Sequence, residues 1–452
     1  MNGLLCVALI CSIGRGDAFH PPTAMGASPT RRSVSIGISA KNRRRNSLSE
    51  DEGCNRHEDL SRRRIIRATV SAAGSCVSPS GLYLPRPALA LDSKTQSTTA
   101  ADAKIPTVRL GGESSTLSVS RTIQGYWQLA GGHGLYKDED AKKNMKAHFD
   151  VGMTTLDTAD IYGPSELLVG QFMSQQKQRQ SKQKLPTATT PIPCTKFCCF
   201  RLLEDINRQE VKERIQRACE RLQVSRLPLV QFFWSNYDAK RYVDVALYLT
   251  ELKDQGYIQE IGATNFDLPR LKELHKADVP LVSHQVQLSC LDRRPVQSGM
   301  SDWCKDNQVS LIGFGTVASG ILSEKFLGRP EPLTQQERTT ASLRMYSATA
   351  QRFGDWSLVQ ELLNVLNEVA IGVREDGRCL TANISNIAQR YVLQTPAVAA
   401  VLIGVRNQDH IAENVATHSF TLKSEEIEAI DRVVSKRKGP RGDVWDIERG
   451  AR

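Results

Sequence analysis

The sequence has no apolar run long enough to cross a membrane. Its longest early apolar stretch, residues 4–13, ends at a glycine and an arginine, whereas a membrane-spanning helix needs about 18 apolar residues. Hydrophobic residues make up 40% and charged residues 24% of the 452-residue chain, which is ordinary for a globular protein. This composition excludes collagen-like, fully disordered and membrane-spanning classes, and we expect a soluble folded body with no membrane insertion.

Regularly spaced cysteines are also missing. Four of the eleven cysteines lie in the first hundred residues, and the other seven are scattered and include the adjacent pair Cys198 and Cys199. A disulfide framework or a zinc motif needs paired cysteines at regular spacing. Cys194 and Cys198 have no second pair or nearby histidine to complete a metal site. We therefore expect ordinary buried thiols and no metal.

Excess basic charge is absent from the part of the chain that we expect to fold. The net charge is +10, but residues 1–100 contain 14 Lys and Arg against 7 Asp and Glu, while the remaining 352 residues contain 45 against 42. A nucleic-acid-binding protein concentrates basic residues on its folded part. We therefore expect no nucleic-acid partner.

Residues 1–105 have the features of a removable targeting segment. The apolar core at residues 3–13 resembles a cleavable secretory signal, and residues 17–19 (DAF) resemble the junction in the two-part presequences of algae with secondary plastids. Residues 62–64 (RRR) resemble a twin-arginine signal, although a disordered basic linker fits them equally well. We predict a largely disordered presequence and a plastid location, with the stroma favoured over the thylakoid lumen. If the presequence is not functional, the expected location is cytoplasmic.

Short apolar runs alternate with amphipathic stretches from residue 106 to residue 436. This alternation is typical of a closed parallel (β/α)₈ TIM barrel that carries insertions. No G-x-G-x-x-G follows the first run, which argues against a doubly wound dinucleotide fold. The eight candidate strands are residues 122–128, 154–158, 191–197, 227–234, 258–264, 283–291, 309–316 and 398–404.

Two connections and the C-terminus stand out from this pattern. Residues 175–190 join the second helix to the third strand, and we expect a solvated insertion on the N-terminal face of the barrel. Residues 323–356 follow the seventh strand on the catalytic face, where a long loop often closes over a ligand. Residues 437–452 form a tail, and its Trp445 either folds back against the barrel mouth or is disordered.

Three polar residues end two neighbouring strands. Asp157 and Tyr162 close the second candidate strand, and Lys196 closes the third. A lysine at ~4 Å, with an effective dielectric near 20, is worth roughly 4 kcal/mol and could lower a phenol pKa by up to ~3 units. A tyrosine so tuned can give a proton to a carbonyl oxygen as hydride arrives at carbon. Taken singly, the three residues also fit a turn cap, surface packing and a loop end.

Several stretches in the same order make the body resemble an aldo-keto reductase over essentially its whole length. The resemblance implies an NADPH-dependent oxidoreductase that transfers hydride to an aldehyde or ketone. The matching stretches are GYWQLAGGHG (125–134), TTLDTADIYGPSE (154–166), TKF (195–197), IGATNFD (261–267), SHQVQLSCLDRRP (283–295), GFGTVASG (313–320) and IGVRNQDHIAEN (403–414).

The resemblance implies three catalytic side chains and one departure. Tyr162 is the expected general acid, with Lys196 and Asp157 as its tuning partners. The family's fourth catalytic residue, a histidine at the end of the fourth strand, is replaced here by Phe233. Loss of such a hydrogen-bond donor typically costs about 10²- to 10³-fold in rate, which would slow carbonyl reduction without abolishing it. Trp234 could supply an N–H instead.

The same resemblance implies a set of residues that bind NADPH. The residues expected at the nicotinamide are Thr264, Asn265 and Gln285, which hydrogen-bond its carboxamide, and Phe314, on which its ring stacks. Those expected at the adenosine phosphate are Gly404, Arg406 and Asn414. Arg406 could pair with a 2′-phosphate because its planar fork grips phosphate oxygens. His410 replaces a basic residue that many members carry there, which weakens the preference for NADPH slightly.

The expected partner is a small carbonyl substrate, and we expect a monomer. The aromatic residues expected to line the substrate pocket are Tyr126, Trp127, Phe233 and Trp234. An alternative, which the missing histidine encourages, is a barrel that binds NADPH with little turnover and acts as a redox-responsive interaction protein. Retention of Asp157, Tyr162 and Lys196 together favours an enzyme.

Overall fold

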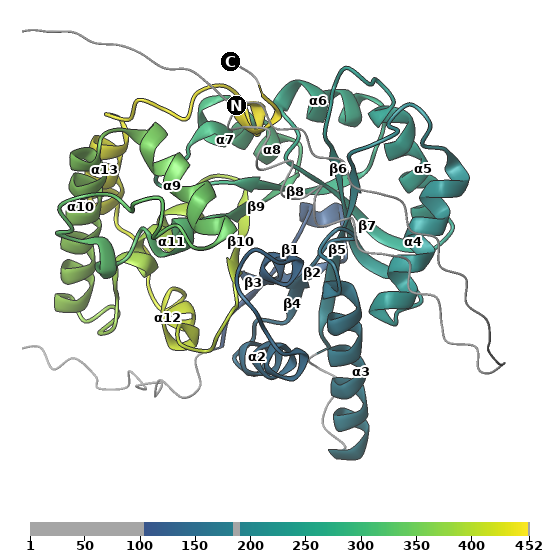
Figure 1. Ribbon diagram of the computed structural model, residues 1–452, viewed down its shortest axis with the longest axis horizontal. Helices are drawn as coiled ribbons and strands as arrows, with labels where there is room; N and C mark the ends of the chain where they lie inside the picture. Colours follow the sequence, from purple (N-terminus) through teal and green to yellow (C-terminus); the bar gives the residue numbers. More distant parts are fainter. Residues whose placement is uncertain (1–103, 184–189, 451–452) are drawn as a thin grey trace, which may run out of the picture. The chain divides into compact units, whose positions relative to one another are not determined.

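The computed structural model describes residues 104–183 and 190–450, and its centre is a closed barrel of parallel strands (Figure 1). The strands follow the order β10-β3-β4-β5-β6-β7-β8-β9, which confirms the predicted (β/α)₈ class. The predicted presequence lies outside the described residues, apart from Lys104 and Ile105. The barrel strands are β3 (Thr122–Gly125), β4 (Thr155–Asp157), β5 (Ile192–Cys199), β6 (Leu227–Trp234), β7 (Ile258–Thr264), β8 (Leu281–Gln287), β9 (Ser310–Phe314) and β10 (Val398–Gly404).

Helices connect the strands and pack around the barrel (Figure 1). The α-helices are α2 (Asp138–Asp150), α3 (Ser165–Gln183), α4 (Arg208–Leu222), α5 (Tyr242–Asp254), α6 (Leu268–Lys276), α7 (Arg294–Gln297), α8 (Met300–Asp306), α9 (Ala341–Phe353), α10 (Trp356–Glu375), α11 (Ile384–Leu393), α12 (Ile411–Ala416), α13 (Ser424–Val434) and α14 (Asp446–Arg449). The 3₁₀ helices in the part of the chain that the structure describes are η1 (Gly112–Ser114), η2 (Trp127–Ala130), η3 (Ala318–Gly320) and η4 (Glu324–Phe326).

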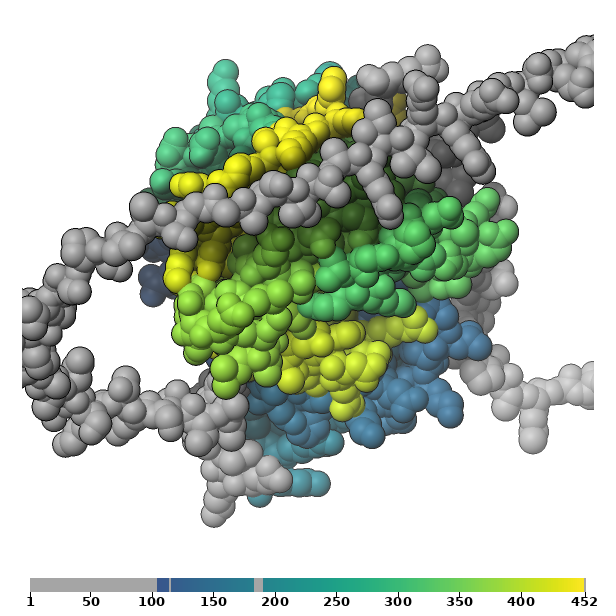
Figure 2. All heavy atoms as spheres, turned by 90° about the vertical axis from the view of Figure 1, so that its left-hand side faces the viewer, coloured from purple at the N-terminus to yellow at the C-terminus, as the bar shows by residue number. Residues whose placement is uncertain are grey.

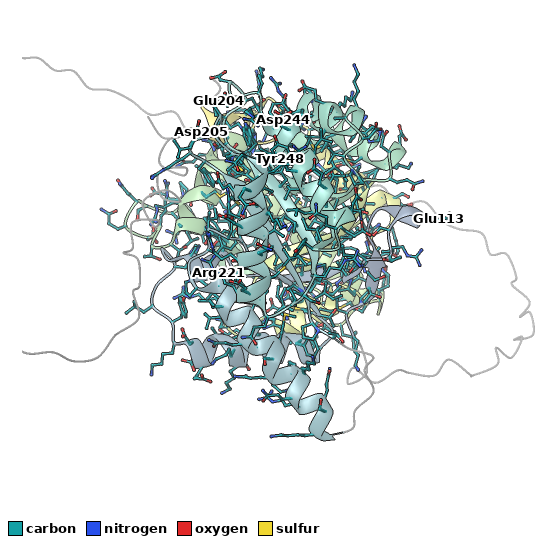
Figure 3. The ribbon with its side chains drawn as sticks, turned by 90° about the vertical axis from the view of Figure 1, so that its right-hand side faces the viewer. Glu113, Glu204, Asp205, Arg221, Asp244 and Tyr248 are labelled. Atoms are coloured by element: carbon teal, nitrogen blue, oxygen red, sulfur yellow. The ribbon has the colours of Figure 1, made fainter. Side chains whose placement is uncertain are left out.

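Helix α4 shows why these stretches are helical. The side chain of Asn207 accepts a hydrogen bond from the Glu210 backbone N–H and so caps the first turn. Apolar residues spaced three and four apart then form one buried stripe against the barrel. Arg221, near the other end of α4 and labelled in Figure 3, pairs with Glu166 of α3 at 3.2 Å. Such contacts order the helix layer without reaching the interior of the barrel.

Side chains along each strand alternate between the barrel interior and the helix layer. In β6, Gln231 points inward and donates to Asp157 Oδ2 at 2.8 Å. Phe232 packs instead on Phe266, with ring centroids 5.4 Å apart. Phe233 shares the inward face with Gln231, because the two are separated by one residue. Whether a residue occupies an inward or an outward position of its strand therefore decides whether its side chain can reach the C-terminal opening of the barrel, which we call the mouth.

A β-hairpin closes the N-terminal end of the barrel. Strands β1 (Thr107–Arg109) and β2 (Ser118–Ser120) pair antiparallel. Leu110, Leu117 and Val119 are buried in one cluster with residues from several barrel strands. Figure 3 labels Glu113 in this hairpin, and Glu204 and Asp205 in the loop after β5 lie on the other side of the view. The barrel therefore has a plugged end and an end where the loops after the strands gather.

Both long connections differ from their expected form. Helix α3 continues to Gln183, so the first part of the predicted insertion at 175–190 is helical, and residues 184–189 lie outside the described residues. Segment 323–356 contains η4 and α9 and is not a structureless loop. The backbone N–H of Ala341 donates to Gly132 O at 2.9 Å, and Gln287 Nε2 donates to Thr349 Oγ1 at 3.1 Å. Helix α9 thus lies at the C-terminal ends of β3 and β8, on the face where we expected a long loop over a ligand.

Of the two alternatives for the tail, the structure shows the folded one. Residues 438–450 run back over the barrel, and Figure 2 shows bright yellow C-terminal residues beside the green α9–α10 layer. The backbone N–H of Lys438 donates to Phe353 O at 2.7 Å, and Leu268 N donates to Asp443 Oδ2 at 2.9 Å. Trp445 is buried. We call residues 438–450 the C-terminal segment.

The seven cysteines of the described residues are all free and buried, as expected of ordinary thiols. Within residues 104–183 and 190–450, no helix has the length and apolar character needed to span a membrane.

Candidate active site

A buried ion pair lies at the C-terminal end of the barrel interior. Lys196 in β5 donates from Nζ to Asp157 Oδ1, at the end of β4, and to Thr158 O at 2.9 Å. The other carboxylate oxygen, Oδ2, accepts from Gln231 Nε2 and Gln285 Nε2, both at 2.8 Å. Burial by itself lowers the pKa of Lys196, but the combined effects of Asp157, Tyr162 and Cys198 outweigh it and raise that pKa above its usual value. Lys196 is therefore a fixed positive charge.

Tyr162 stands beside this charge, in the turn that follows β4. The Lys196 ammonium lies 5.0 Å from the centroid of the Tyr162 ring. Burial raises the pKa of Tyr162 to about 12, and the opposing effect of Lys196 is smaller. The prediction that Lys196 lowers the phenol pKa below its ordinary value is wrong for this state, because loss of water around the phenolate outweighs one nearby cation. The phenol is therefore a proton donor at neutral pH.

An amide oxygen without a hydrogen-bond partner among the described residues lies directly after β7, beside the end of β8. Asn265 has a left-handed backbone, with φ 57°, and its N–H donates to Gln285 O at 3.0 Å. Its side-chain Oδ1 is buried and has no hydrogen-bond partner among the described residues. Thr264 Oγ1 also donates to Gln285 O, at 3.1 Å. A carboxamide NH₂ would satisfy Asn265 Oδ1, so these residues fit a nicotinamide amide.

Phe314 ends β9 at the same mouth and remains partly exposed. Its ring lies 6.3 Å from that of Trp445, at an interplanar angle of 69°. Trp445 comes from the C-terminal segment, so the residue predicted to stack on a nicotinamide is contacted by a part of the chain more than a hundred residues away.

Two arginines gather beside His133 at the ends of β3 and β10. Arg406 follows β10, and its Nη2 lies 2.9 Å from where a Cβ on Gly134 would be, while the φ of Gly134, 91°, favours glycine at that position. Burial lowers the pKa of His133, and the positive charges of Arg406 and Arg344 lower it further. Arg406 is exposed and forms no ion pair with any described carboxylate. Arg344, on α9, was not singled out from the sequence.

The other predicted phosphate-loop residues lie close to Arg406 in the chain. Gly404 ends β10 and is exposed, whereas Asn414 is buried in α12. His410 is exposed, and its Nδ1 lies 2.9 Å from Glu413 Oε2. His410, which stands where the family resemblance implies a basic residue, is therefore already engaged with Glu413.

A cleft of about 490 Å³ opens beside Tyr162. It lies between the loop after β3 and the turn after Tyr162, and it is lined by Leu129, Ala130, Gly131, Gly132, Gly134, Leu135, Tyr136, Gly163 and Pro164. Trp127 lies near it in η2, with its ring 4.9 Å from that of His133. Phe233 points inward, 5.1 Å from the ring of Phe200.

Two predicted pocket walls are misplaced. Trp234 points into the helix layer, where its Nε1–H donates to Asn236 O at 2.8 Å and Ala239 O at 3.0 Å. Because its only N–H is already bonded, Trp234 can neither line the mouth nor replace the missing histidine as a donor. Tyr126 is buried on the helix side, where its hydroxyl donates to Gln124 Oε1 at 2.6 Å. Strand parity, which the apolar run alone does not reveal, causes both errors.

Besides Arg344, two further residues of the site were missed from the sequence. Gln231 holds Asp157, and its signal was a polar residue inside the otherwise apolar run LPLVQFFW. Arg449 donates from Nη2 to Trp234 O at 2.9 Å and to Asn265 O at 2.7 Å, at the ends of β6 and β7. No local pattern marks Arg449, because its role depends on the chain folding back.

Comparisons with known proteins find relatives that match most of this chain. The sequence model of the Aldo/keto reductase family matches residues 122–435. Aldo-keto reductase YhdN of Bacillus subtilis is 24% identical over 324 residues, which cover 70% of this chain and 91% of that protein. The NADH-specific methylglyoxal reductase of Escherichia coli is 23% identical over 341 residues, covering 70% of this chain and 97% of that protein. The structure of a glycerol dehydrogenase from Gluconobacter oxydans matches with a TM-score of 0.60 and 18% identity, over 74% of this chain and 97% of its own.

Proposed function

The chain belongs to the aldo/keto reductase family, and we propose that it is an NADPH-dependent oxidoreductase that reduces an aldehyde or ketone with Tyr162 as general acid. The observation that carries this proposal is the Asp157–Lys196 pair placed beside a half-buried Tyr162, whose pKa is raised to about 12 so that the phenol keeps its proton at neutral pH. The family membership supports nicotinamide-dependent carbonyl chemistry. The roles of individual residues and the choice of NADPH are the proposed part.

Each residue has a distinct task in this mechanism. A bound nicotinamide supplies the hydride. Thr264, Asn265 and Gln285 orient its carboxamide, with Asn265 Oδ1 as the free acceptor, and Phe314 supports its ring.

Proton transfer completes the reduction. The Tyr162 hydroxyl gives its proton to the carbonyl oxygen as the new C–H bond forms at the carbonyl carbon, so that the product is an alcohol. The Lys196 charge then stabilises the phenolate, and Asp157 keeps Lys196 charged and in place. Solvent returns the proton to Tyr162 after product leaves.

The proposed preference for NADPH rests on the positive charges of the Arg406 and Arg344 side chains. A 2′-phosphate carries charge that an arginine fork binds well, and Arg406 has no ion pair of its own among residues 104–183 and 190–450. A relative that is NADH-specific makes the choice worth measuring directly. We expect Arg406→Ala to weaken NADPH binding about tenfold or more and to leave NADH binding unchanged, as followed by quenching of tryptophan fluorescence.

The test of the function uses the full chain with NADPH and a panel of aldehydes and ketones. We expect oxidation of NADPH that depends on the carbonyl compound and on Tyr162. Tight NADPH binding without turnover of any carbonyl compound would contradict the proposal and favour the interaction-protein alternative.

We also propose that residues 1–105 direct the chain to a plastid, with the stroma as the destination. N-terminal sequencing of the mature protein isolated from its source tests this. A mature protein that begins near residue 105 supports removal of a presequence, and one that retains residue 1 contradicts it.

A further inference from the structure

Arg449 is an unpaired cation at the mouth of the barrel. Its Nη2 donates to the backbone carbonyls of Trp234 and Asn265. Its Nε and Nη1 are buried and have no hydrogen-bond partner within the described residues. Burial lowers the pKa of Arg449, and the nearby tyrosine and carboxylates oppose this effect only in part. A buried charge is normally paired, because loss of its hydration is strongly unfavourable.

Carboxylates near Arg449 are already engaged elsewhere. None lies within ion-pair distance of its guanidinium among residues 104–183 and 190–450. The neighbouring carboxylates and their partners are Asp267 with Arg270 (3.3 Å), Glu448 with Arg294 (2.8 Å), Asp443 with Leu268 N (2.9 Å) and Asp446 with Asp443 N (2.7 Å). The charge that would neutralise Arg449 is therefore not supplied by the described chain.

Arg449 also lies close to the reaction site. Its guanidinium carbon is 5.6 Å from the centroid of the Phe233 ring and 4.2 Å from that of Tyr237. Phe233 points into the barrel on the same face as Gln231, which holds Asp157. The cation therefore stands over Phe233, the position at which the family resemblance implies a histidine that this chain lacks.

Arg449 lies at the edge between the buried interior and the surface. Arg449 as a whole is partly exposed, although Nε and Nη1 lie beneath the surface. A ligand that reached these two nitrogens would satisfy donors that are otherwise without a partner among the described residues. An oxyanion matches the two parallel N–H donors of an arginine better than any neutral group does.

We propose that Arg449 binds an anionic group of the substrate, so that the site selects carbonyl compounds bearing a carboxylate or a phosphate. This inference rests on the proposed function and gives its substrate class. Phe233 then forms an apolar floor between the anion at Arg449 and the carbonyl at Tyr162.

Matched substrate pairs test the proposal with the full chain and NADPH. One pair is 4-carboxybenzaldehyde and its uncharged methyl ester, and the other is glyceraldehyde 3-phosphate and glyceraldehyde. We expect kcat/KM to favour the anionic member of at least one pair by about 10- to 100-fold, and that pair identifies the oxyanion. In Arg449→Gln the preference should disappear through a rise in KM for the anionic member, with the neutral member unchanged.

Two further variants keep the test decisive. Arg441→Gln removes an exposed arginine of the same segment and should leave the preference intact. Arg449→Lys keeps the charge without the planar fork and should retain part of the preference, even if Arg449→Gln fails to fold. Equal turnover of both members of both pairs, or an equal loss on charged and neutral members in Arg449→Gln, would overturn the proposal.

A binding measurement separates this inference from the proposed function. If no aldehyde is reduced, the proposed function fails, and calorimetric titration of benzoate and inorganic phosphate into the full chain with NADP⁺ still decides the role of Arg449. Binding of either anion that is lost in Arg449→Gln supports the anion site. Absence of binding, or binding that persists in the variant, rejects it.

Discussion

The two ends of the barrel are closed by different kinds of contact. At the N-terminal end, the β1–β2 hairpin buries Leu110, Leu117 and Val119 against the strands. At the C-terminal end, the C-terminal segment adds charged contacts to apolar ones, because Glu448 pairs with Arg294 at 2.8 Å while Val444 and Trp445 are buried. Apolar burial is non-directional and no ligand replaces it, whereas charged contacts are directional and can be exchanged for those of a ligand. The comparison separates an end that supports the fold from an end that can do chemistry.

The largest expected effect is on the chemistry at the mouth. Tyr162→Phe removes the proton donor and should lower kcat for carbonyl reduction about 10²- to 10⁴-fold, with the melting temperature nearly unchanged. Steady-state kinetics and thermal unfolding measure the two quantities. Tyr248→Phe on α5, at the side of the barrel labelled in Figure 3, is the control and should keep full activity. Comparable activity in both variants would mean that the mouth does not use Tyr162 as an acid.

At the N-terminal end of the barrel, which the β1–β2 hairpin closes, a substitution should lower stability without changing activity. Leu110 is fully buried in the hairpin cluster, so Leu110→Ala should lower the free energy of unfolding by about 2–5 kcal/mol while kcat at 25 °C stays the same. Denaturant unfolding followed by fluorescence measures this. Leu380→Ala, at a side chain that is 77% exposed, should have little effect. A loss of activity in folded Leu110→Ala would show that the two ends are not independent.

The ion pair that holds the C-terminal segment should contribute less to the free energy of unfolding than the apolar cluster of the β1–β2 hairpin does. Glu448→Gln removes the charge that accepts from Arg294 Nη1 at 2.8 Å and Nη2 at 3.2 Å. We expect a loss of about 1.5–3 kcal/mol, since Asp292 still pairs with Arg294, together with faster proteolysis of the C-terminus. The exposed Glu428→Gln is the control. Unchanged proteolysis would mean that apolar contacts of Trp445 hold the segment instead.

Restoring the missing histidine tests the chemistry of the mouth more finely. Phe233 faces the barrel interior beside the catalytic pair, so Phe233→His should add a donor near the carbonyl and raise turnover of a neutral aldehyde, by about tenfold at most. Steady-state rates with benzaldehyde measure it. An unchanged or lower rate would indicate that the apolar ring is adapted to the substrate.

The smallest expected change is the response of carbonyl reduction to pH. Because the pKa of Tyr162 is raised to about 12, the phenol stays protonated as pH rises through neutrality, and kcat should be nearly flat from about pH 6 to pH 9. Alcohol oxidation needs the phenolate and should rise with pH over the same interval. A fall in the reduction rate near pH 7 would contradict the raised pKa.

Local patterns predicted the barrel well, because they are set by short-range chemistry. Alternation of apolar runs with amphipathic stretches predicted a run at each of the strands β3 to β10, although β5 ends two residues after its run and β8 begins two residues before its run. Asp157 and Lys196 were expected to lie together because parallel strands end at one face. The helical continuation of α3 to Gln183 was missed, since its residues are polar all round and carry no apolar stripe.

Long-range effects were not predictable in the same way. Trp234 was assigned to the pocket because an apolar run does not say which side chains face inward. The pKa of Tyr162 was expected to fall, because a single charge can be counted from the sequence while burial depends on every element packed around the phenol.

The sequence by itself determined the (β/α)₈ architecture and the pairing of a carboxylate with an ammonium at its C-terminal end, because both follow from periodicity and from the order of residues along each strand. Only the tertiary structure decided the inward or outward direction of each aromatic side chain, the protonation of Tyr162 and the return of Arg449 to the mouth. These depend on water removed by distant segments, and burial is a property of the whole fold.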